Sequence, residues 1–182
     1  MRKEIIGIIL FFLVIFTLIS LLSYSPQDPS INNARATGDI QNLFGIFGAH
    51  VSGTLITLFG IGAFWLPVLL LLLSVQFFTK TSDGLIYQRI GGGLILIITT
   101  GSLIAFYSDH LTVFGSRFSS GGIVGIQLKS FLEAYTNTSG GLIILLLVWL
   151  IGFILTTGFS LVRFYRHFRE VGARIRERLK TV

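Results

Sequence analysis

The chain has 182 residues, of which 52% are hydrophobic and 12% are charged, and its mean hydropathy is +0.82. A soluble domain carries about 25% charged residues, so this chain has too few charges to cover a water-facing surface. It contains no cysteine, which excludes a disulfide framework and thiolate chemistry, while its net charge of +6 leaves nucleic acid and anionic membranes as candidate partners.

Long apolar runs dominate the sequence. A membrane-spanning helix needs about 20 apolar residues, and in lipid a helix satisfies its own backbone hydrogen bonds. The sequence therefore predicts an all-α membrane protein, a four-transmembrane-helix bundle whose membrane domain covers residues 1–162. The predicted spans are residues 4–23, 53–78, 90–107 and 140–162, of which the third is the shortest.

A proline-rich turn follows the first span. Pro26 and Pro29 cannot continue a helix, and Asp28 favours a turn. We therefore expect the helix to end at the membrane surface and to enter a polar outer loop. The alternative of a cleaved signal peptide is disfavoured, because the apolar run is too long and no Ala-x-Ala site follows it.

Small residues mark the second and fourth spans. Gly53, Gly60 and Gly62 precede Pro67 in the second span, and Gly152 lies in the fourth. Glycine permits close contact between helices, and proline inside a helix produces a kink. The sequence predicts close helix packing at these glycines and a kink at Pro67.

The second outer loop, residues 108–139, contains an apolar segment that is too short to span. Its residues 121–135 predict a short amphipathic helix, packed on the outer leaflet or on the bundle, with docking of a partner as the alternative. Ser120 and Ser139 each precede a pair of glycines, and we expect both serines to cap the helices that follow. The apolar residues of the predicted helix are Ile123, Val124, Leu128, Phe131, Leu132 and Tyr135.

The basic residues are unevenly distributed. Eleven of the fourteen Lys and Arg residues lie at the N-terminus, between the second and third spans, or after the fourth, which places both termini in the cytoplasm. Residues 163–182 predict a basic, helical cytoplasmic tail that contacts anionic lipid headgroups rather than DNA. Its predicted lipid-facing residues are Arg163, Arg166, Arg169, Arg174, Arg176 and Arg178.

Motifs for chemistry are missing from the sequence. It contains no phosphate-binding loop, and Trp65 occupies the place of the last glycine in an incomplete GxGxxG pattern. His50, His110 and His167 lack the spacing of metal ligands. We therefore predict no catalytic residue, no cofactor and no metal site. A small channel or transporter subunit is the alternative function, although no charged residue lies in the middle of a span to support it.

Several motifs occur in an order that resembles one family. Residues 23–30, SYSPQDPS, are similar to the S-[YF]-x-P-x-D-P-S signature that ends the first span of FtsK/SpoIIIE-type DNA translocases, and residues 42–49 resemble its N-x-x-G-x-x-G-A motif. The glycine-rich second span, residues 120–125 and residues 139–141 also match in order. The resemblance covers nearly the whole chain and implies the N-terminal four-span membrane domain of that family.

The resemblance also implies a role. In the family this domain anchors a hexameric, ATP-driven DNA pump in the bacterial inner membrane at the division septum, and it contacts other division proteins. The linker and motor that follow in the family do not match this sequence, so we expect a fragment or a relative without a motor, with DNA contacted only through that missing motor. The expected partner-docking loop includes Pro26, Asp28, Pro29, Asn42, Gly45 and Gly48.

Overall fold

The computed structural model describes residues 2–31, 33, 39–79, 84–113 and 115–159, and it confirms a mostly helical chain with four helical segments long and apolar enough to cross a membrane. The basic tail from residue 160 onward lies outside the described residues, so its helical structure remains a prediction. The elements in chain order are α1 (Arg2–Leu22), α2 (Gly45–Phe59), a 3-10 helix η1 (Gly60–Phe64), α3 (Trp65–Phe78), α4 (Gly84–Tyr107), β1 (His110–Val113), β2 (Ser116–Ser119) and α5 (Gly122–Thr157).

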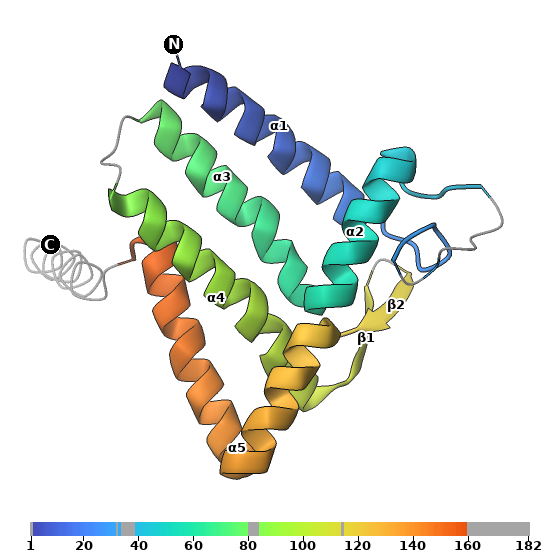
Figure 1. Cartoon of the computed structure of the whole chain (residues 1–182), viewed down its shortest axis with the longest axis vertical. Coiled ribbons are helices and arrows are strands. Elements are labelled where there is room, and N and C mark those ends of the chain that lie inside the picture. The colour runs from blue at the N-terminus through green and yellow to red at the C-terminus, as the bar shows by residue number, and fades with distance from the viewer. Residues whose placement is uncertain (1, 32, 34–38, 80–83, 114, 160–182) are drawn as a thin grey trace, which may run out of the picture.

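The long helices form a single row rather than a bundle around one shared core. α1 packs on α3, α3 on α4, and α4 on α5, whereas α1 has at most marginal contact with α4 or α5 in the described part of the chain (Figure 1). The start of α1, the end of α3, the start of α4 and the end of α5 share one end of the row, here called the terminal end. The loop after α1, helix α2 and the β-strands lie at the opposite end, here called the hairpin end.

Small and polar residues join neighbouring helices of the row. Ser74 Oγ of α3 donates a hydrogen bond to the Gly7 carbonyl of α1 at 2.9 Å. A Cβ atom on Gly92 of α4 would lie 2.7 Å from the carbonyl oxygen of Gly152 of α5, so only glycine permits this approach. Trp149 Nε1 donates to Thr100 Oγ1 at 2.9 Å across the same interface. Gly152 thus lies where the backbones of α4 and α5 approach closely, as small residues between helices permit.

The second apolar segment bends before Pro67, not at it. Helix α2 ends at Phe59, η1 forms a corner, and α3 begins at Trp65. Pro67 falls in the first turn of α3, where a backbone N–H has no partner within the helix and its loss costs nothing. The corner lies on the N-terminal side of Pro67, and the contribution of Pro67 to it stays a prediction. The corner depends on Gly60, whose φ of +57° is unfavourable for other residues.

The last apolar segment also bends. Asn137 has non-helical dihedral angles (φ 58°, ψ 176°) and divides α5 into an N-terminal half and a C-terminal half (Figure 1). Asn137 Oδ1 accepts a hydrogen bond from Gly140 N at 3.3 Å, which caps the second half. Asn137, not Ser139, is thus the cap. The helix ends at Thr157, five residues before the predicted end, because Gly158 adopts a left-handed conformation at its C-terminus.

A short antiparallel hairpin lies between α4 and α5 and was not predicted. β1 pairs with β2 in a register that places His110 opposite Ser119 and Val113 opposite Ser116. Phe118 of β2 is buried in a cluster with Leu21, Ile56 and Ala63, which come from α1, α2 and η1. This cluster of buried apolar side chains joins four elements at the hairpin end.

Candidate functional site

The proline-rich turn after α1 is held by buried polar side chains. Asp28 is 3% exposed, and its carboxylate accepts hydrogen bonds from Gln41 N at 2.8 Å and Asn42 N at 2.9 Å. These bonds connect Asp28 to residues about a dozen positions further along the chain and so close a loop. The negative charge of the carboxylate strengthens both bonds. Asp28 therefore holds the two ends of the first outer loop together.

Asn42 fastens this closed loop to the helices. Its side chain is 4% exposed, and its Nδ2 donates to the Ser20 carbonyl at 2.8 Å and lies 3.3 Å from Ser52 Oγ. Gly48 sits beneath it, because a Cβ atom there would collide with the Asn42 side chain. Among the residues expected to dock a partner, Asp28, Asn42 and Gly48 are thus buried, Pro26 is exposed, and Pro29 and Gly45 are half-buried.

The exposed part of this region is apolar. Leu43 is 78% exposed and Phe47 is 77% exposed, directly beside the buried Asn42. Ile46 is 52% exposed on the same first turn of α2. The buried motif residues therefore shape the loop, and these apolar neighbours form the surface that it presents.

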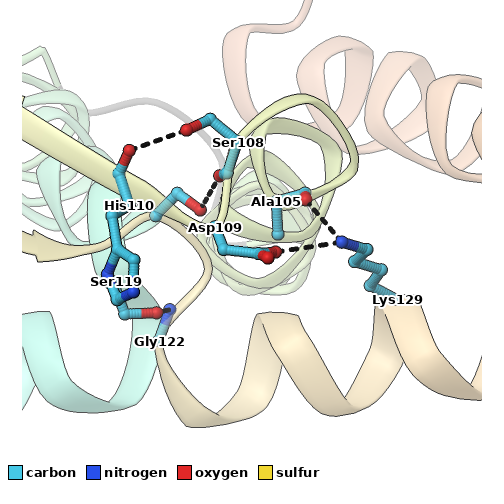
Figure 2. A network of polar contacts seen from close by, with 8 residues as sticks. Ala105, Ser108, Asp109, His110, Ser119, Gly122 and Lys129 are labelled. Carbon is cyan, nitrogen blue, oxygen red and sulfur yellow. Dashed lines mark hydrogen bonds and ion pairs between the residues drawn. The ribbon is translucent and has the colours of Figure 1, made fainter.

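A second polar network joins α4, the hairpin and α5 (Figure 2). Ser120 Oγ donates to the Ser108 carbonyl, and Ser120 N donates to the Asp109 carbonyl at 3.0 Å. The Ser120 carbonyl in turn accepts from Ile61 N of η1 at 2.9 Å. Ser120 thus joins η1 to the segment that follows α4. The N-cap position of α5 is Gly121, not Ser120. The neighbouring Ser119 Oγ accepts a hydrogen bond from Gly122 N at 3.1 Å.

Lys129 completes this network from the N-terminal half of α5. Its Nζ donates to the Ala105 carbonyl at 2.8 Å and pairs with Asp109 Oδ1 at 3.0 Å (Figure 2). Ala105 lies in the last turn of α4, where carbonyl groups lack partners within the helix and a cation is favourable. Lys129 therefore fixes the N-terminal half of α5 across the end of α4.

A hollow of about 430 Å³ lies between α2, β2 and α5 at the hairpin end. Its lining is uncharged, with Ile56, Phe118 and Ile126 beside the polar side chains of Tyr24 and Gln127. Burial raises the pKa of the Tyr24 phenol, and the nearby negative charge of Asp28 raises it further. The hollow is therefore lined by apolar and uncharged polar side chains.

The predicted packing glycines lie at close contacts. A Cβ atom would meet Ser30 at Gly53, Ser120 at Gly60 and the Ile97 carbonyl at Gly62. Two of these contacts involve the hairpin end, because Ser30 belongs to the first outer loop and Ser120 precedes α5. The predicted basic tail residues, Arg163 to Arg178, lie outside the described residues.

The histidines of the described residues lie at the surface. His50 and His110 are exposed, and among the described residues no group of three His, Asp or Glu side chains gathers as a metal site would require. The sequence missed the roles of Ser119 and Lys129, since neither belongs to a recognisable motif. The paired glycines after Ser120 could have indicated that the backbone of this segment approaches another element closely. They could not have indicated that Ser120 bonds to Ile61.

The row of apolar helices defines the class of protein: a multi-pass membrane domain with four helical segments able to span. The chain belongs to the family described as the 4TM region of DNA translocase FtsK/SpoIIIE, whose model matches residues 1–169. The matching region is the membrane region and not the ATPase motor of that family. No solved structure matches the chain.

Curated relatives agree with this assignment. The chain is 40% identical over 151 residues to the DNA translocase FtsK of Vibrio vulnificus, which covers 80% of this chain and 15% of that protein. It is 30% identical over 154 residues to the DNA translocase FtsK of Shewanella oneidensis (81% and 16%) and 31% identical over 140 residues to that of Rickettsia bellii (75% and 17%). The chain therefore spans about one sixth of the length of these relatives.

Proposed function

We propose that this chain is the membrane anchor and assembly module of an FtsK-type DNA translocase, acting at the division septum in cell division and chromosome segregation. The observation that carries the proposal is the family match over residues 1–169, which concerns the four-span region of named DNA translocases. On this proposal the domain lies in the bacterial inner membrane with both termini in the cytoplasm, and it assembles as a homo-oligomer, a hexamer by resemblance. DNA is contacted only by a motor.

The polar groups in the spans favour an anchor over a channel or transporter subunit. Thr99 Oγ1 donates to the Ile95 carbonyl, Ser102 Oγ to the Ile98 carbonyl, and Thr156 Oγ1 to the Gly152 carbonyl. These three hydroxyls are thus bonded within their own helices, and Ser74 and Thr100 bond to a neighbouring helix of the row. Hydroxyl groups with such partners stabilise helix packing, whereas a channel needs polar groups that face a pore. A flux assay in liposomes tests this point, since an ion current carried by the purified chain would favour the alternative.

The proposed docking surface for other division proteins is the hairpin end. Buried Asp28 and Asn42 hold the first outer loop in shape, and the hollow beside Ile126 offers a neutral site for an apolar side chain. On the opposite end, the basic tail is proposed to contact anionic lipid where a linker leaves the membrane. The two ends of the domain therefore have different partners in this proposal.

Septal localisation tests the proposal. The chain, fused to a fluorescent protein and produced in dividing bacteria that lack their own four-span domain, should gather at the septum. Ile126→Trp fills the hollow and should leave the protein amount unchanged while reducing septal signal. Tyr107→Trp is the matched control, because Tyr107 is 96% exposed near the same end. An even signal around the whole membrane for the unaltered chain would contradict the proposal.

A further inference from the structure

The second and fourth apolar segments are longer than a bilayer is thick. Gly45–Phe78 has 34 residues and Gly122–Thr157 has 36. At about 1.5 Å per residue each would extend roughly 50 Å, whereas the hydrocarbon core measures about 30 Å. Only part of each segment is needed to cross the membrane, and both segments contain a bend.

The bend in α5 leaves a C-terminal half of the right length. Residues 138–157 run beside α4, with Gly152 against Gly92 and Trp149 bonded to Thr100. The N-terminal half, Gly122 to Thr136, instead runs across the hairpin end of the row (Figure 1). Lys129 fixes it to the end of α4 through the Ala105 carbonyl. This half therefore has a position of its own, separate from the spanning half.

One flank of the N-terminal half is apolar and exposed. Phe131 is 58% exposed and Tyr135 is 77% exposed, and their rings lie 4.8 Å apart, as expected for residues four apart on a helix. The opposite flank carries the charged residues of this half, Lys129 and Glu133, which are also four apart. The face toward the row is buried at Leu132. The half-helix is therefore amphipathic, and its two charged residues lie on the side opposite Phe131 and Tyr135.

This flank continues into the apolar surface of the spanning half. Only two residues separate Tyr135 from Thr138, where the spanning half begins, and Ile143, one turn further on, is 70% exposed. Tyr and Phe are suited to this level, because amphipathic aromatic rings favour the boundary between headgroups and acyl chains. Because the spanning half begins just after Tyr135, the apolar flank lies at the level where this helix enters the membrane.

We propose that the N-terminal half of α5 does not span but lies in the headgroup region of the leaflet at the hairpin end, with Phe131 and Tyr135 inserted among phospholipids. The half-helix then acts as a second lipid anchor that sets the depth of the hairpin end. This inference requires a membrane-spanning domain but not a role in division. Its test is therefore independent of septal localisation.

The test uses single cysteines, because the chain has none of its own. The full chain is reconstituted in vesicles of phosphatidylethanolamine and phosphatidylglycerol, with a nitroxide label at Phe131→Cys or Tyr135→Cys. Collision rates with oxygen, which concentrates in lipid, and with a water-soluble nickel chelate give the depth of the label. Ser130→Cys is the matched control, an exposed position about 100° around the same helix from Phe131, and Leu147→Cys, 60% exposed on the spanning half, is the deep reference.

The expected result is an oxygen-to-nickel ratio several-fold above that of Ser130→Cys and clearly below that of Leu147→Cys at both aromatic positions. A ratio equal to that of Ser130→Cys would place the flank in water and overturn the proposal. A ratio equal to that of Leu147→Cys would mean that this half also spans. Protection from both reagents would mean that protein, not lipid, covers the flank, which would likewise overturn it.

Discussion

At the scale of single residues, Asp28 combines burial with charge. Its two carboxylate oxygens each accept one backbone N–H, from Gln41 and Asn42. A buried carboxylate is costly unless it is hydrogen-bonded, so these two bonds both satisfy Asp28 and close the loop. Asp28, which the sequence predicts as part of a partner-docking loop, therefore has a structural role that can be measured without any partner.

Asp28→Asn should lower the stability of the domain by about 1–3 kcal/mol, because the amide NH₂ group replaces an acceptor with a donor facing a backbone N–H. Thermal unfolding in detergent micelles, followed by circular dichroism, measures the change. Asp39→Asn is the matched control, since Asp39 is exposed. Equal melting temperatures for the two variants would show that the Asp28 bonds do not stabilise the fold.

Tyr24 provides a pH-dependent prediction. Its pKa is raised above the ordinary 10.0, first by burial and then by the charge of Asp28, so the folded state favours the neutral phenol. The resulting stability is present below the ordinary pKa and is lost as the pH rises through the higher folded value. In an absorbance titration of the folded protein, Tyr24→Phe should remove a phenol that ionises above the ordinary pKa of 10.0, and an unchanged titration curve at high pH would contradict this prediction.

At the scale of elements, the bends at η1 and at Asn137 set the direction of the helices that follow them. Gly60 ends α2 with a positive φ, and a Cβ atom there would lie 2.5 Å from the Ser120 carbonyl carbon and 2.6 Å from the Ser119 carbonyl oxygen. These are backbone atoms of another element, which cannot move aside as the end of a flexible side chain can. The corner therefore depends on both the conformation and the size of glycine.

Gly60→Ala should destabilise the domain by about 1–3 kcal/mol, because it adds backbone strain and a collision. Gly91→Ala is the opposite control. Gly91 lies inside α4 with nothing within 4 Å of its Cβ position, so alanine there should be neutral or stabilise by up to about 1 kcal/mol through its helix propensity. Chemical denaturation in mixed micelles compares the two, and a larger loss at Gly91 than at Gly60 would contradict the role of the corner.

At the scale of the whole molecule, the direction of insertion follows from the basic residues. Eleven of fourteen Lys and Arg residues belong to the terminal end or to segments joined to it, which predicts that this end faces the cytoplasm. A reporter enzyme that is active only outside the inner membrane should be silent after Val182 and active when inserted near Asn33. The reverse pattern would mean that the hairpin end faces the cytoplasm.

The fold class and the four apolar segments could be predicted from the sequence, since hydropathy and segment length are local properties of the chain. It also singled out Asp28 and Asn42 as docking residues and the glycines as packing residues, and these roles stay predictions. Their order along the chain was enough for the family resemblance, because that comparison needs no knowledge of contacts.

The positions of the bends and the contacts of the motif residues could not be predicted from the sequence. The bend at η1 requires Ser120, some sixty residues away, to approach Gly60, and the burial of Asp28 requires Gln41 and Asn42 to return to it. The hairpin was missed because its short strands carry a weak local pattern and are held by Phe118 in a cluster of distant residues. Such features depend on contacts between segments, and a pattern read along a single chain does not contain them.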